Sequence, residues 1–150
     1  MTSKIIADTL EQRRALAVTV LRIKPEELTT HERNLAMALL REKPVMVDQG
    51  VVYTQREGDW AVFAPLTNWE DYGDIVSNQE LVVGSHARYD DESDSEKVTG
   101  HWYSAHAYFG GTTTEGCDLR EVVSETCAKL LNHNVEYAES WQVSSETDDA

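Results

Sequence analysis

The sequence has few of the residues that cross-link or rigidify a small fold. It has two cysteines and three prolines among 150 residues. Cys117 and Cys127 lack the paired spacing of a disulfide framework or a zinc site. A chain of this length buries enough apolar surface to fold without disulfides. The cysteine content therefore predicts a reducing compartment, and we expect a cytoplasmic protein.

Long hydrophobic runs are missing as well. No apolar stretch approaches the roughly 18 residues of a membrane-spanning helix. The first residues, MTSKIIADTLEQRR, lack the apolar centre of a signal peptide. We therefore expect no membrane segment and no membrane partner.

Motifs for nucleophilic catalysis and phosphate binding are also absent. The sequence contains no G-x-S-x-G, no Gly-rich loop followed by Lys-Ser/Thr and no G-x-G-x-x-G. We predict a non-enzymatic protein without catalytic residues, metal or cofactor. One alternative is an enzyme with a site of scattered residues, in which His101 or His106 acts as acid or base.

Positive charge is scarce, and most of it lies early in the chain. The net charge is -14. Residues 1–45 contain eight Lys and Arg against six Asp and Glu, whereas residues 46–150 contain five against twenty-one. An acidic body repels a phosphate backbone. It suits a basic protein partner, although salt adaptation and solubility also explain an acidic surface.

Two helices are predicted near the N-terminus. Residues 3–23 have apolar side chains near helical spacing. In residues 29–43, Thr29 and Glu32 have the spacing of a capping box, in which each side chain bonds to the other residue's backbone N–H. Pro44 ends the second helix.

The apolar pattern then changes to the alternation of strands. Short β-branched and aromatic runs between residues 45 and 110 predict strands separated by turns. Residues 66–79 predict a loop with a helical turn. Residues 118–132 have one apolar face, which predicts an amphipathic helix packed on the sheet. Residues 135–143 alternate and predict a last strand.

The predicted fold class is therefore α+β. It combines two N-terminal helices, a mostly antiparallel sheet of about five to six strands and the helix 118–132. We divide the chain into a helical segment, residues 1–44, an acidic body, residues 45–143, and a frayed acidic tail, residues 144–150.

An acidic stretch, residues 90–96, precedes a histidine- and aromatic-rich run. Its alternation superficially fits a calcium loop, which needs Gly at its sixth position and Glu at its twelfth. Counted from Asp90, those positions hold Ser95 and His101. We therefore interpret the stretch as the exposed end of a strand pair, without a metal.

The histidines do not suggest a metal site either. His101 and His106 are five residues apart in a predicted strand. Because side chains alternate between the two faces of a strand, an odd separation places them on opposite faces. They cannot share a metal unless a bulge intervenes.

Aromatic rings among carboxylates distinguish the segment NWEDYGD. Such rings suit contact with a basic partner. We therefore combine this segment with the acidic stretch into one predicted partner-binding surface. It consists of Trp69, Glu70, Asp71, Tyr72, Asp74, Asp90, Asp91, Glu92, Asp94 and Glu96.

The N-terminal arginines support an alternative, a nucleic-acid-binding regulator. LTTHERNLAMALLRE has the pattern of the first helix of a helix-turn-helix unit, but Pro44 and a strand follow where the recognition helix should come. Direct nucleic-acid binding is therefore less favoured than protein binding. Its contacts would be Arg13, Arg14, Arg33 and Arg41.

The function that these patterns favour is binding of a basic or nucleic-acid-binding protein. Inhibitors, immunity factors and nucleic-acid mimics work in this way, including accessory proteins of phages and plasmids. In a mimic, carboxylates occupy the positions where phosphates would sit. A structural or assembly subunit that forms homo-oligomers is a further alternative.

Overall fold

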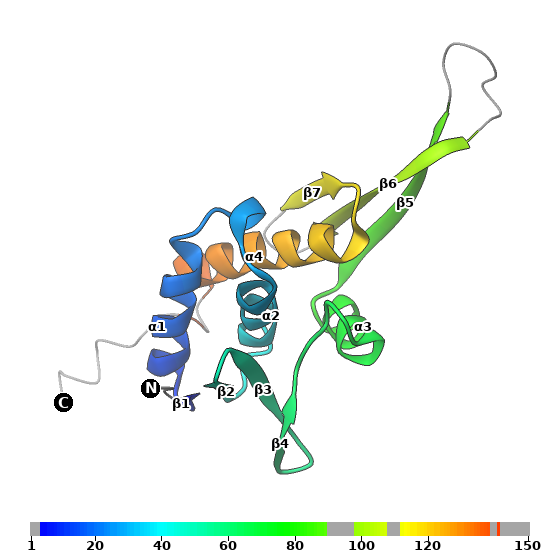
Figure 1. The fold of residues 1–150 in the computed structure, drawn as a ribbon. Helices are drawn as coiled ribbons and strands as arrows, with labels where there is room; N and C mark the ends of the chain where they lie inside the picture. The colour runs from blue at the N-terminus through cyan, green and yellow to red at the C-terminus, as the bar shows by residue number, and fades with distance from the viewer. Residues whose placement is uncertain (1–3, 90–97, 108–111, 139–140, 142–150) are drawn as a thin grey trace.

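The computed structural model describes residues 4–89, 98–107, 112–138 and 141, and its architecture is α+β (Figure 1). These residues form four α-helices and two antiparallel sheets. The predicted fold class is thus confirmed. The strands, however, are divided between a four-stranded and a three-stranded sheet, where the sequence pattern predicted one sheet of five to six strands.

The first sheet contains four strands in chain order. They are β1 (Lys4–Ala7), β2 (Val45–Asp48), β3 (Val51–Arg56) and β4 (Asp59–Val62), and each is antiparallel to the next. The β2–β3 and β3–β4 turns each have two central residues with positive φ, which is the geometry of a type I′ hairpin. The residues are Gln49 and Gly50 in one turn and Glu57 and Gly58 in the other.

The prediction of a helix from residue 3 is wrong at its start, because residues 4–7 form β1. This segment reads KIIA, and adjacent isoleucines favour extended backbone. Helix α1 (Leu10–Leu21) begins only after Thr9, which forms a capping box with Gln12. Because β1 pairs with β2, the N-terminal segment and the acidic body share one sheet.

A 3-10 helix, η1 (Pro25–Glu27), leads into helix α2 (Thr30–Leu39). The predicted capping box is present. The Thr29 hydroxyl accepts a bond from the Glu32 N–H at 3.2 Å, and the Glu32 carboxylate accepts one from the Thr29 N–H at 2.9 Å. The helix start that sequence spacing predicts here is therefore confirmed.

The predicted loop at residues 66–79 contains a helix, α3 (Trp69–Asn78). The Asn68 side chain accepts bonds from the N–H groups of Glu70 and Asp71, at 2.9 and 3.3 Å. Acidic residues in a first turn also suit the positive end of the helix dipole. Ile75 anchors the helix, because it is fully buried. The polar composition of residues 66–79 did not indicate a helix of this length.

The second sheet has the order β5 (Leu81–Tyr89), β6 (Val98–Ala107) and β7 (Thr113–Gly116). β5 and β6 pair along their length, with a register shift at Arg88 and Tyr89. They form a ribbon that extends away from the helices (Figure 1).

Helix α4 (Leu119–Tyr137) packs on β6, β7 and α2. It is longer than the predicted helix 118–132 and includes part of the segment for which a last strand was predicted. Trp141 follows α4 and is fully buried. Its backbone N–H donates to the Ala138 carbonyl at 3.0 Å. No helix in the described ranges has the length and apolar composition to cross a membrane.

A buried arginine on α2 links this helix to η1 and to α4. Arg33 on α2 is 6% exposed, and its guanidinium bonds to both η1 and α4. The acceptors are the carbonyls of Glu26, Leu28 and Glu121, the Ser124 hydroxyl and the Glu125 carboxylate. A buried cation needs this many partners to offset its lost hydration.

Replacing this arginine tests its structural role. We expect Arg33→Met to lower the free energy of unfolding by about 3 kcal/mol, because the Glu125 carboxylate and several buried acceptors lose their donor. Urea denaturation measures the change. Arg22→Met is the matched control, since Arg22 is exposed. Equal stability of the two variants would contradict the role of Arg33.

Candidate partner-binding surface

Carboxylates gather where the β3–β4 turn meets the start of α3. Arg56, the last residue of β3, lies 3.2 Å from the Glu70 carboxylate and 3.8 Å from that of Asp74, and it also contacts Asp71. Glu57 and Asp59 flank Gly58 in the adjacent turn and are exposed. We call this set the acidic corner. It consists of Arg56, Glu57, Asp59, Glu70, Asp71 and Asp74.

Asp71 holds the acidic corner together from inside. It is 2% exposed, and its carboxylate accepts bonds from the Arg56 guanidinium and from the Ala64 N–H, the latter at 2.9 Å. The side chains of Glu70 and Asp74 are 74% and 48% exposed. Asp71 therefore fixes the position of α3, whereas Glu70 and Asp74 are available to a partner.

The aromatic residues predicted for this surface differ in their placement. Tyr72 is half-buried and packs against the core. Burial raises the pKa of its hydroxyl, and the nearby Arg120 guanidinium partly offsets this. Trp69 begins α3, and its side chain is outside the part of the structure that is described.

The other half of the predicted surface lies outside the described residues. It consists of Asp90, Asp91, Glu92, Asp94 and Glu96. In the chain these residues connect the end of β5 to the start of β6. The structure therefore brings together Glu70, Asp71 and Asp74 but does not relate them to the acidic stretch.

The cations of the acidic body are bonded within the fold. After residue 45 the structure describes three Lys and Arg side chains, those of Arg56, Arg120 and Lys129. Arg120 donates to the Leu66 carbonyl. Lys129 donates to the Thr113 carbonyl and the Thr114 hydroxyl, both at 2.9 Å. Many carboxylates of the same body are exposed, namely those of Glu57, Asp59, Glu70, Glu80, Glu115, Asp118, Glu121 and Glu136.

The N-terminal arginines do not form one exposed basic face. Arg33 is enclosed between α2 and α4, so it has no surface to offer to nucleic acid. The Arg41 guanidinium lies over the Phe63 ring, 5.4 Å from its centroid. Arg13 donates to the Asp8 carbonyl at 2.9 Å, and Arg14 is half-buried on the same helix. Of the four arginines that the nucleic-acid alternative names, Arg33 is therefore buried.

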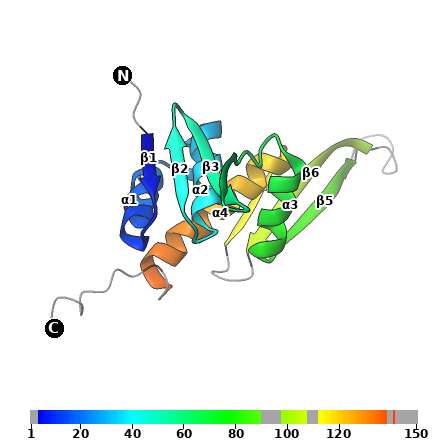
Figure 2. The same ribbon diagram turned by 90° about the horizontal axis from the view of Figure 1, so that it is seen from below.

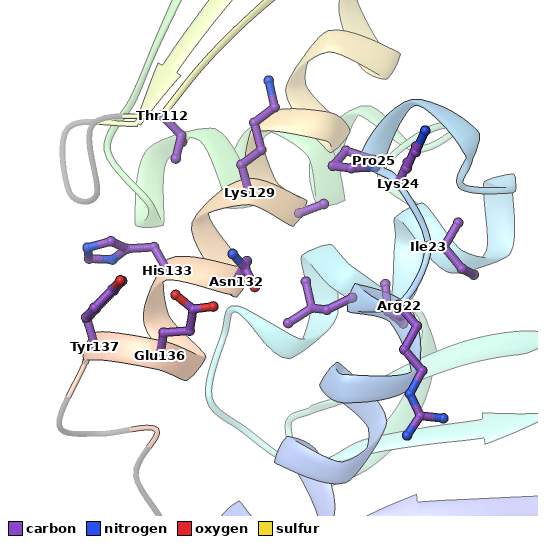
Figure 3. A pocket seen from close by; sticks show the side chains of 13 residues that line it. Arg22, Ile23, Lys24, Pro25, Thr112, Lys129, Asn132, His133, Glu136 and Tyr137 are labelled. Atoms are coloured by element: carbon purple, nitrogen blue, oxygen red, sulfur yellow. The ribbon is translucent and has the colours of Figure 1, made fainter.

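A groove of about 550 Å³ lies between the end of α1, the segment leading into η1, and α4 (Figure 3). Its lining combines apolar side chains with Arg22, Lys24, Lys129 and Glu136. On its α4 side the His133 and Tyr137 rings lie 5.2 Å apart. Lys129, at the edge of this groove, is bonded to Thr113 and Thr114 of β7. Sequence reasoning did not find this groove, since its residues come from distant segments.

The histidines are dispersed over the second sheet and α4. His86 stacks on Trp102, with centroids 3.9 Å apart, and its ring nitrogen lies 3.1 Å from the Ser104 hydroxyl. The register of β6 with β5 is continuous from His101 to His106, so no bulge lies between these two residues. Within the described part of the chain, no three His, Cys, Asp or Glu side chains group in a way that could hold a metal ion.

Comparison with known proteins adds no relative. No family model matches the chain, and neither a curated protein nor a solved structure matches it. Function must therefore be argued from the residues and their geometry.

The two roles within the acidic corner can be separated by neutral substitutions. We expect Asp71→Asn to lower the free energy of unfolding by about 2 kcal/mol, because the buried Arg56 contact loses its charge. The same change on the surface, Glu70→Gln, should leave stability within about 0.5 kcal/mol of the unmodified chain. Urea denaturation of both variants decides this. If Glu70→Gln is destabilised and Asp71→Asn is not, then Glu70 and not Asp71 is the carboxylate that stabilises the fold.

The two thiols should differ in reactivity. Burial raises the pKa of Cys127 to about 12, whereas Cys117 is exposed. Because the thiolate is the reactive form, we expect Ellman's reagent at neutral pH to modify Cys117 in the native protein and Cys127 only after unfolding. A Cys117→Ser variant should then show no fast thiol. A fast thiol in that variant would show that α4 opens readily around Cys127.

Proposed function

We propose that the protein is a non-enzymatic acidic interaction protein that binds a basic protein through the acidic corner. The observation that supports this proposal is the unequal use of charge. The described cations of the acidic body are bonded within the fold, whereas many of its carboxylates are exposed. A basic surface arriving from solution therefore meets carboxylates with few cations to oppose it.

The concentration of the carboxylates favours binding over a role in solubility alone. Solubility requires only charges dispersed over the surface. In the acidic corner, the carboxylates of Glu70, Asp71 and Asp74 lie within 3.8 Å of the single guanidinium of Arg56. Glu57 follows Arg56 in the chain, and Asp59 is its register partner on β4. The mutual repulsion of these carboxylates destabilises the free protein, and a cationic side chain from a partner relieves it.

The acidic corner is also held rigidly. Glu70 and Asp74 belong to a helix capped by Asn68, and Glu57 and Asp59 belong to a tight I′ turn. A partner therefore orders few side chains when it binds, which lowers the entropic cost of association. Proteins that normally bind nucleic acid present basic surfaces of this kind, so we place the partner in that class.

Affinity capture at two salt concentrations tests the proposal. We expect the immobilised protein to retain basic proteins at about 50 mM salt and to release them at about 500 mM, because salt screens exposed charges. The control is a variant in which the exposed carboxylates of the corner become amides and the buried Asp71 is kept. It carries Glu57→Gln, Asp59→Asn, Glu70→Gln and Asp74→Asn.

Mass spectrometry of the two retained fractions gives the result. Proteins with basic isoelectric points should be enriched on the unmodified protein and depleted on the amide variant. If both columns retain the same proteins at low salt, the acidic corner is not a binding surface.

A further inference from the structure

The groove between α1 and α4 is basic although the chain as a whole is acidic. We call this space, which residues 22–25 also border, the α1–α4 groove. Among the described residues that line it are three cations, those of Arg22, Lys24 and Lys129, and one carboxylate, that of Glu136. The net charge of the chain is -14. Its positive charge therefore sets this groove apart and favours an anion as its occupant.

The cations of the α1–α4 groove have N–H donors to spare. Arg22 and Lys24 are exposed, and within the described part of the chain neither forms an ion pair or a side-chain hydrogen bond. Lys129 donates to the Thr113 carbonyl and the Thr114 hydroxyl. An ammonium has three N–H donors, so one donor of Lys129 has no acceptor among the described residues.

The lining has a polar end and an aromatic end (Figure 3). Lys129 lies beside the start of β7, near Thr112, and the rings of His133 and Tyr137 follow it along α4. Because these α4 residues are spaced by four, they share one face of the helix over about 12 Å. With a volume of about 550 Å³, the groove has room for a small two-ring molecule.

Apolar side chains between these ends suit the body of such a molecule. Val20 and Ala128 are buried, and half-buried Pro25 borders them. Tyr137 is 71% exposed, and its ring lies 5.2 Å from that of His133. Aromatic rings pack on one another at such separations. A flat aromatic ring therefore gains both apolar burial and ring contacts here.

Two polar atoms of the lining lack a partner in the free protein. Thr112 Oγ1 and His133 Nδ1 are buried and accept or donate no hydrogen bond within the described residues. Buried polar groups in native proteins are nearly always bonded. The Thr112 side chain as a whole is half-buried, so its hydroxyl can turn toward an oxygen that enters the groove.

We infer that the α1–α4 groove binds a small aromatic carboxylate. Its ring packs on the apolar lining and on the rings of His133 and Tyr137, and its carboxylate accepts bonds at the end formed by Thr112 and Lys129. Because Glu136 shares the groove, a singly charged carboxylate suits it better than a doubly charged phosphate. This site goes beyond the proposed function, since the acidic corner has no part in it.

Naphthoate is the probe, and two related molecules separate its parts. Naphthamide has the same rings without the charge, and acetate is the head group alone. We expect naphthoate to bind with a Kd of about 1 mM or below at about 50 mM salt. Naphthamide should bind at least fivefold more weakly, and acetate should not saturate. NMR titration gives the affinities, and the backbone signals of Asn132 and His133 should shift most.

A change that removes only the Thr112 hydroxyl tests the polar end. Thr112→Val keeps the shape of the side chain and should weaken naphthoate binding about fivefold, because the carboxylate loses a donor. Stability in urea should not fall, since that hydroxyl has no partner in the free protein. Thr54→Val is the matched control, because Thr54 Oγ1 on β3 is also buried without a partner. It should bind naphthoate like the unmodified protein.

Removal of two positive charges tests the attraction for the anion. Arg22→Gln together with Lys24→Gln should weaken naphthoate binding about fivefold and leave naphthamide binding unchanged. The control, Lys4→Gln with Lys43→Gln, removes the same charge from exposed positions that do not line the groove. It should retain the affinity of the unmodified protein.

Each other outcome overturns the inference. Equal binding of naphthoate and naphthamide removes the anion, and saturable acetate binding of equal strength removes the aromatic ring. The absence of saturable naphthoate binding at about 10 mM shows that the groove is not a site of this kind. An equal loss of affinity in the control variants, or largest shifts on β3 or β5, places the binding elsewhere. None of these results bears on the acidic corner, whose test uses basic proteins.

Discussion

The buried Arg33 guanidinium is the interaction on which the arrangement of the two sheets depends. Among the described strands, neither sheet pairs with the other through backbone bonds, and the helices α2 and α4 connect them by packing. Arg33 donates to the carbonyl groups of η1 and to three residues of α4. Apolar side chains pack in many orientations, whereas a planar guanidinium bonds well in few. It therefore fixes how the helices meet.

The predictable parts of the fold were those governed by local chemistry. The Thr29–Glu32 capping box and the strands after Pro44 follow from spacing and period, and both are present. β1 was missed, and α3 was expected only as a helical turn within a loop, because tertiary context decides both elements. The KIIA segment is short enough to join either a helix or a strand, and pairing with β2 selects the strand. The polar α3 is held by Asn68 and by the buried Ile75.

The candidate site shows the same division. Composition identified the carboxylates of residues 70–74, but it could not separate exposed Glu70 from buried Asp71, since that difference depends on Arg56 fourteen or fifteen positions away. Nor could it reveal which residues lie side by side in the first sheet. Val62, Tyr53, Met46 and Ile6 become one row only through three strand pairings. The charges of the residues can be counted from the sequence. Which residues lie side by side on neighbouring strands can be known only from the register of the strands.

The strand order of the first sheet also determines when β1 can find its partner. β1 leaves the ribosome first, yet its only neighbour in the sheet as described is β2, which begins about forty residues later. Until then Ile5 and Ile6 have no strand to pair with, and the row ends at Val62 only after both hairpins have closed. Val62 precedes every strand of the second sheet, so the first sheet can be completed before the second one. A nascent chain in which β1 pairs with another β1 would be trapped, and the brevity of this strand limits that risk.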